Sequence, residues 1–160
     1  MSSRNSLILA HLILVAAGGY FWWRGQASQQ IEKKVDLFIE TVEFRKLSLT
    51  TVETRHEACR ELFARVVEVD TPEPAPSGTY SRDEVTEQLD RFHSYISFFE
   101  IEESNRKIAL DSEIAEAEVT GVFQVAFGPK SRENVDGSLT LSFEKKEEDW
   151  KIVRVKVIEN

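Results

Sequence analysis

The chain has 160 residues, of which 41% are hydrophobic, and a formal net charge of −8 at pH 7. This length suits one globular domain with a short additional segment, and no second hydrophobic core is expected. The acidic balance argues against a nucleic-acid partner, because the phosphates of a nucleic acid need a basic surface.

Sequence motifs for cofactor or metal chemistry are absent. A single cysteine, Cys59, excludes an intrachain disulfide and a cysteine-rich zinc site. The sequence contains no glycine-rich phosphate loop, nucleophile elbow, zinc signature or dinucleotide fingerprint. We therefore expect no cofactor and no metal ion, and we assign no catalytic residue.

The N-terminal segment from Leu7 to Trp23 is an uncharged run of 17 residues, at the short end of what spans a bilayer as a helix. Four aromatic residues precede Arg24, as in the interfacial belt of a retained anchor. We predict that residues 1–25 are a single-pass anchor in a bacterial cell membrane, with the domain on the outer, periplasmic side. The alternative is a signal peptide whose cleavage secretes the domain.

After the apolar segment, the apolar residues recur at the spacing of an amphipathic helix. Residues 26–46 form a predicted amphipathic helix that continues out of the membrane segment. Its apolar stripe consists of Ile31, Val35, Phe38, Ile39 and Val42. Thr50, with Glu53 three residues later, has the spacing of a capping box and predicts a second helix that extends to about Val69.

A loop and a third helix come next. Residues 71–79 hold three of the four prolines of the chain, so we expect a loop there. Ser81 and Glu84 repeat the capping-box spacing and predict a third helix over residues 81–92.

The rest of the chain alternates apolar and polar residues, which is typical of half-buried strands. One predicted strand starts after His93 and is interrupted near residues 103–105. Three more span residues 115–127, 138–144 and 153–157. The joints between the last three strands are short and polar, so we predict an antiparallel meander with one apolar face.

The apolar face of the meander contains no ionisable side chain, which makes it ill suited to proton chemistry. Gly121, which has no Cβ, is where we expect the longest strand to bend, and the inward series of that strand ends at Phe127. On the polar face, cross-strand ion pairs are expected among Glu116, Glu118, Arg154 and Lys156.

The predicted order of elements is three helices, then a strand, then a long antiparallel meander. This order resembles the fold of the α+β superfamily of nuclear transport factor 2, ketosteroid isomerase and polyketide cyclase. The segments that carry the resemblance are SRDEVTEQLDRF (81–92), IALDSEIAEAEVTGVF (108–123) and GSLTLSFEKKEEDWKIVRV (137–155). The resemblance implies one domain over residues 26–160, in which three helices pack on a curved, mainly antiparallel sheet shaped like a cone. Enzymes of this superfamily place ionisable side chains inside the cone, where burial shifts their pKa values.

Four polar residues form the only candidate ligand-binding group. Asp90, His93 and Tyr95 lie where the third helix meets the next strand, and His56 on the second helix can approach them at the mouth of the cone. His56 also lies one turn from Cys59. The interpretation that we favour for this last pair is a packed thiol beside a hydrogen-bonded imidazole.

Two functions remain open. The first is a membrane-anchored, non-enzymatic domain for self-association as a homodimer or for assembly with an envelope protein, similar in plan to assembly subunits of type IV secretion systems. The second is binding, or acid–base turnover of the isomerase, dehydratase or cyclase kind, of a small apolar molecule in the cone. An open cavity reached by at least two of the four polar residues favours the second function, and a filled cone favours the first.

Overall fold

A computed structural model describes residues 2–46, 51–73, 75 and 77–160, with side chains described from residue 15 onward. Its elements are α1 (Ser2–Val42), β1 (Phe44–Arg45), α2 (Val52–Leu62), β2 (Phe63–Asp70), β3 (Gly78–Ser81), α3 (Arg82–Tyr95), β4 (Phe98–Asp111), β5 (Ile114–Gly128), β6 (Ser131–Lys146) and β7 (Asp149–Glu159). The strands form one seven-stranded sheet in the order β1-β4-β5-β6-β7-β2-β3. Neighbouring strands are antiparallel except β2 and β7, which are parallel. The predicted α+β class with a mainly antiparallel sheet is confirmed.

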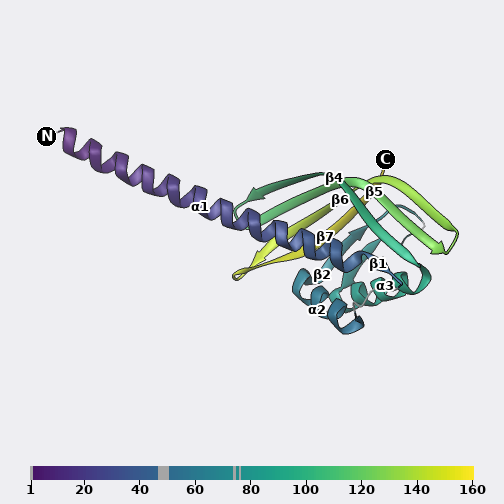
Figure 1. The fold of residues 1–160 in the computed structure, drawn as a ribbon. Coiled ribbons are helices and arrows are strands. Elements are labelled where there is room, and N and C mark those ends of the chain that lie inside the picture. The colour runs from purple at the N-terminus through teal and green to yellow at the C-terminus, as the bar shows by residue number, and fades with distance from the viewer. Residues whose placement is uncertain (1, 47–50, 74, 76) are drawn as a thin grey trace.

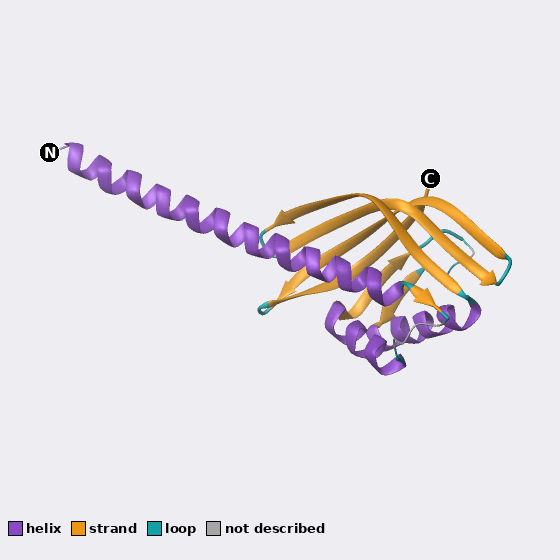
Figure 2. Cartoon of the chain, viewed as in Figure 1, coloured by secondary structure: helices purple, strands orange, loops and turns teal. Residues whose placement is uncertain are grey.

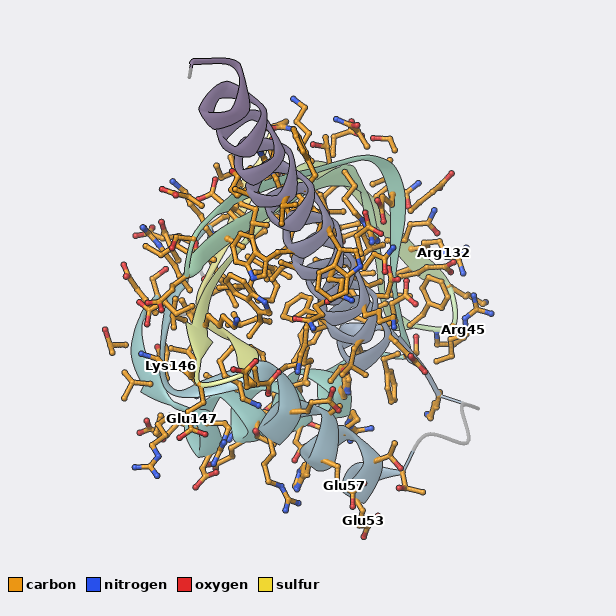
Figure 3. The ribbon with its side chains drawn as sticks, turned by 90° about the vertical axis from the view of Figure 1, so that its left-hand side faces the viewer. Arg45, Glu53, Glu57, Arg132, Lys146 and Glu147 are labelled. Atoms are coloured by element: carbon orange, nitrogen blue, oxygen red, sulfur yellow. The ribbon has the colours of Figure 1, made fainter. Side chains whose placement is uncertain are left out.

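The sheet is curved and curls around the C-terminal half of α1, whereas the N-terminal half of this helix projects away from the domain (Figure 1). Figure 2 shows that α2 and α3 lie together beside the open side of the curl. In the view along α1, the strands surround the helix and α2 lies below it (Figure 3). The core therefore lies between the inner face of the sheet and the three helices.

Helix α1 confirms the predicted amphipathic stripe, because Ile31 and Val35 are fully buried and Phe38 is 5% exposed. The helix is continuous from the apolar segment into the domain, as the sequence predicts. No helix in the described part of the chain is long and apolar enough to cross a membrane. Large apolar side chains that are more than half exposed on the projecting part of α1 are Val15, Tyr20, Phe21 and Trp22.

A buried lysine holds α1 against the rest of the domain. The Nζ atom of Lys34 lies 3.1 Å from the carboxylate of Asp149 at the start of β7 and 3.2 Å from the carbonyl oxygen of Glu61 in α2. Burial acts to raise the pKa of Asp149, but hydrogen bonds from Lys151 and Lys34 outweigh it and hold this pKa below its usual value. Lys34 is tolerated inside because its charge is paired.

Helix α2 is shorter than predicted. The side chain of Thr51 caps it by accepting a hydrogen bond from the backbone N–H of Thr54, and Thr50 lies outside the described residues. The prediction that this helix extends to about Val69 is wrong, because the chain becomes β2 at Phe63. Aromatic and β-branched residues dominate this stretch, and pairing with β7 and β3 favours the extended form.

Helix α3 begins with the predicted capping box. The Ser81 hydroxyl accepts a hydrogen bond from the Glu84 backbone N–H at 3.2 Å, and the Glu84 carboxylate accepts one from the Ser81 N–H at 2.7 Å. The bond from the Ser81 backbone N–H, together with a hydrogen bond from the Ser81 side chain, holds the pKa of the Glu84 carboxyl below its usual value. The sequence does not predict β1 and β3, because strands of two and four residues are too short to show a period.

The bend in the sheet lies where the sequence predicts it. The strand β4 is continuous from Phe98 to Asp111, but its pairing with β5 shifts between Glu103 and Asn105, where the sequence predicts an interruption. Gly121 faces Glu103 at this point, and a Cβ on Gly121 would overlap the carbonyl oxygen of Glu102. The missing side chain therefore lets the two strands approach closely at the bend.

Two predictions about the meander are wrong. Phe127 is 58% exposed, because it is the extra residue of a bulge at the end of β5 and faces no residue of β6. The expected ion pairs of Glu116 and Glu118 with Arg154 and Lys156 are excluded because β6 separates β5 from β7.

Candidate ligand-binding site

A hollow lies between α1, α3 and the inner face of the sheet. It consists of two adjoining parts with volumes of about 510 Å³ and about 400 Å³. The residues that line both parts are Phe38, Val42, Thr71, Leu89, Phe92 and Val155. Because the two parts share these lining residues, they lie next to each other, and we call them together the cone cavity.

The walls of the cone cavity are apolar because the periods of the surrounding elements direct apolar side chains inward. The 3.6-residue period of α1 and α3 places Phe38 and Leu89 on the faces that meet the sheet. The two-residue period of the strands turns Ile101, Phe123 and Leu139 toward the same space. The side chains on the sheet wall are well buried: Leu139 is 2% exposed and Ile101 is 8% exposed.

Polar side chains line the cone cavity at a few positions, and one of them, Thr71, lines both parts. Gln88, Arg91 and Tyr95 of α3 line one part, and Tyr95 is 74% exposed, so its ring lies at an opening. Glu159, at the end of β7, lines the other part. Arg91 donates a hydrogen bond from Nη2 to the carboxylate of Glu87, one turn earlier on the same helix, at 2.6 Å.

His56 and Asp90 meet, as expected from the sequence, but they meet outside the cone cavity. The Nε2 atom of His56 lies 2.6 Å from one carboxylate oxygen of Asp90, and Arg55 donates to the other at 3.2 Å. Asp90 thereby connects α2 to α3. Neither His56 nor Asp90 is among the described residues that line the cavity.

His93 is a buried structural residue. It is 4% exposed, its Nε2–H donates to the carbonyl oxygen of Val42 at 2.9 Å, and its ring stacks on Phe44 at 4.7 Å. Burial lowers the pKa of His93 below its ordinary value, although the bond to Val42 acts in the opposite direction. The imidazole is therefore neutral near pH 7 and fixes the end of α1 to α3.

Cys59 is a packed thiol, as the sequence predicts. Its side chain is fully buried in α2. Burial raises the pKa of the Cys59 thiol, which outweighs the lowering effect of a hydrogen bond with Thr86. A thiol with a raised pKa and no exposure is a poor nucleophile.

No family model matches this chain, and no curated protein sequence matches it. Several solved structures, however, match the structure of this chain. The "Putative Scytalone Dehydratase" from Novosphingobium aromaticivorans has a TM-score of 0.68 at 16% identity over 86% of each chain. A nuclear transport factor 2-like superfamily protein from Salmonella enterica has a TM-score of 0.67 at 13% identity, over 85% of this chain and 92% of that one. A nuclear transport factor 2-like protein from Cytophaga hutchinsonii has a TM-score of 0.60 at 8% identity, over 81% of this chain and 95% of that one.

The fold is nuclear transport factor 2-like. This confirms the resemblance read from the sequence at the level of the fold, which is all that identities this low can show. Among the described residues of this nuclear transport factor 2-like chain, no group of three or more His, Cys, Asp or Glu side chains is arranged to hold a metal ion.

Sequence reasoning missed the amide and charged side chains of the nuclear transport factor 2-like cone, which are Gln88 and Arg91 in one part and Glu159 in the other. Gln88 and Arg91 line the cavity, and both share a helical face with Phe92 and Tyr95. That spacing was the available signal. It was hidden because an exposed Gln or Arg on a helix ordinarily marks the solvent side.

Proposed function

We propose that this domain binds a small apolar molecule in the cone cavity and does not act on it by acid–base chemistry. The observation that carries the proposal is the cavity itself, a hollow of several hundred Å³ with apolar walls and few polar groups. Sites for small molecules commonly have this composition. Each Å² of apolar ligand surface buried there contributes about 25 cal/mol.

The positions of the polar residues support binding without proton transfer. A general base must lie within hydrogen-bonding reach of the proton that it removes. Asp90 is occupied by His56 and Arg55, and His93 donates to the backbone. Only Tyr95 of the four sequence candidates lines the cavity. Two similar structures carry dehydratase names, which support a ligand in the cone but not a reaction at this level of identity.

A pair of matched valine substitutions tests the binding. Val42→Phe adds a ring inside the cavity, whereas Val52→Phe adds the same ring at a position on α2 that is 48% exposed. The probe is the apolar fluorophore N-phenyl-1-naphthylamine, added to the full-length chain in phosphatidylcholine nanodiscs, with empty nanodiscs as the blank. We expect Val42→Phe to weaken binding by about tenfold or more, equivalent to about 1.4 kcal/mol, and Val52→Phe to leave it unchanged.

Leu89→Trp provides a second way to fill the cavity if Val42→Phe folds poorly, because Leu89 lines both parts. Circular dichroism checks that each variant is folded. Unchanged probe binding in both folded cavity variants would contradict the proposed function.

We also propose that residues 1–25 tether the domain to a cell membrane and place it in the periplasm. The support is the uncharged run from Leu7 to Trp23 and the exposed apolar side chains, Tyr20 and Phe21 among them, on the part of α1 that projects from the domain (Figure 1). Lipid would cover these side chains. After alkaline extraction and external protease treatment, we expect a membrane-bound N-terminal fragment. A soluble product that begins near Ser28 would instead support the secreted alternative.

Self-association as a homodimer and assembly with an envelope protein stay predictions. Ile114 and Phe127 are 60% and 58% exposed and offer apolar surface that a partner could cover. Native mass spectrometry of the full-length chain tests self-association, for which we expect a dimer. A strictly monomeric species at high protein concentration would count against it.

A further inference from the structure

The two parts of the cone cavity carry opposite charges. Among the described residues that line it, Arg91 is the only cation and Glu159 is the only anion. Gln88 and Tyr95 lie in the same part as Arg91 and add an amide and a hydroxyl that can donate hydrogen bonds. An anionic group is therefore favoured near Arg91 and disfavoured near Glu159.

Arg91 is available to a ligand. Its pair with Glu87 joins residues one turn apart, and both side chains are 61% exposed. Exposed pairs of this kind contribute only a few tenths of a kcal/mol. A ligand carboxylate can replace Glu87 or share the guanidinium with it, because the guanidinium has five N–H donors in a planar fork.

Between Arg91 and Glu159 the cavity needs an apolar ligand body. The surfaces that connect the two parts are the side chains of Phe38, Leu89 and Phe92, and the wall along the sheet is hydrocarbon. An unbranched chain needs the narrowest opening to extend from one part into the other, whereas a polar body would lose its hydration and meet a single polar side chain, that of Thr71, on the shared walls. The space therefore suits a long and narrow apolar group.

We infer that the ligand of the cone cavity is an amphiphilic carboxylate with an unbranched hydrocarbon chain, bound with its carboxylate at Arg91 and its chain directed toward Leu139. This inference rests on the proposed function and names the class of ligand. Each further CH₂ contributes about 0.8 kcal/mol, which is about a fourfold gain in affinity, until the chain fills the space.

Decanoate and decanol test the head group, because they share a chain length and differ in charge. Both compete with the fluorophore for the full-length chain in phosphatidylcholine nanodiscs near pH 8. We expect decanoate to bind about twofold to fivefold more tightly than decanol, because an ion pair with a largely exposed guanidinium contributes a few tenths of a kcal/mol to about 1 kcal/mol. A series from hexanoate to dodecanoate tests the chain and is expected to show the stepwise gain.

Two substitutions with opposite expected signs identify the arginine. Arg91→Gln is expected to remove the preference for decanoate. Glu87→Gln removes the competing carboxylate and is expected to strengthen decanoate binding by a few fold. Decanol binding is expected to change less than decanoate binding in both variants. Arg65→Gln is the matched control, because Arg65 is exposed and is not among the described residues that line the cavity.

The outcomes separate this inference from the proposed function. If decanol binds as tightly as decanoate, or if Arg91→Gln keeps the preference, the carboxylate assignment is overturned and the apolar cavity remains a binding site. The carboxylate assignment would also be overturned if decylamine bound more tightly than decanoate and if Glu159→Gln removed that preference. The head group of the ligand would then be a cation. If none of these amphiphiles displaces the fluorophore, the ligand class is wrong; if the fluorophore itself does not bind, both proposals fail.

Discussion

His93 shows how a single buried side chain can join three elements. It belongs to α3, stacks on Phe44 of β1 and donates a hydrogen bond to Val42 at the end of α1. A histidine near the end of a helix commonly satisfies a terminal carbonyl of the same helix. In the structure the carbonyl belongs to α1, which is remote in the chain.

The lowered pKa of His93 predicts a loss of stability in acid. The folded-state pKa lies below the unfolded value of about 6.5, so this contribution to stability is fully present above that pH and is lost as the pH falls through the folded value. The free energy of unfolding should fall by at most about 1.4 kcal/mol per pH unit from this group. Urea unfolding between about pH 5 and pH 8 measures it.

His93→Gln is the matching variant, because an amide at this position can still donate to Val42 but does not titrate. We expect the acid-dependent loss of stability below about pH 6.5 to be smaller in this variant. An identical pH profile for the two proteins would show that His93 is not responsible.

Burial of Cys59 predicts an unreactive thiol. The side chain is fully buried and its pKa is raised, so the reactive thiolate is scarce and inaccessible. We expect no reaction with Ellman's reagent in native buffer and one thiol per chain in denaturant. Rapid stoichiometric labelling of the folded chain would contradict this description of α2.

At the scale of the elements, two glycines set the curvature of the sheet. Gly121 of β5 lies opposite Gly137 of β6. A Cβ on Gly137 would lie 2.6 Å from the ring of Phe123 and 2.7 Å from the carbonyl oxygen of Ile158. The sequence predicts the bend at Gly121 because a strand interior rarely contains glycine. Gly137 has a similar role but lies at the edge of a predicted loop, where glycine is ordinary.

Alanine substitution separates a glycine that the fold requires from one that it does not. Gly121→Ala would force β4 and β5 apart and should lower the free energy of unfolding by about 1–3 kcal/mol. Gly128→Ala is the control, since a Cβ there meets nothing within 4 Å. Chemical denaturation measures both. Equal stability of the two variants would contradict the close approach of the strands.

The elements that the sequence predicts well are those in which local pattern and tertiary contacts agree. The stripe of α1, the capping box of α3 and the shift in the pairing of β4 are of this kind. β2 is different, because the helical pattern of α2 does not show where it ends, and pairing with β7 and β3 adds to the strand preference of its aromatic and β-branched residues. Pairing partners distant in the chain cannot be read from a local period.

At the scale of the whole molecule, the candidate site depends on which faces of the helices meet the sheet. The sequence predicts an apolar interior, because the inward positions of β5, β6 and β7 contain no ionisable side chain. It also places His56 near Asp90, and the structure shows these two joined by a hydrogen bond. The sequence does not predict that this pair lies outside the cavity while Arg91 lines it. The rotation of α3 about its own axis decides which of two neighbouring residues faces the cavity, and the sequence does not fix that rotation.

The central claim is that the cone cavity is an apolar binding site. Isotope-filtered NOE spectra of the full-length chain in nanodiscs of deuterated lipid, with saturating decanoate, test it most directly. We expect NOEs from the ligand chain to the methyl groups of Val42, Leu89 and Val155, which line both parts of the cavity. NOEs only to exposed methyl groups such as those of Val52 and Val66, or none to the cavity at saturation, would contradict the claim.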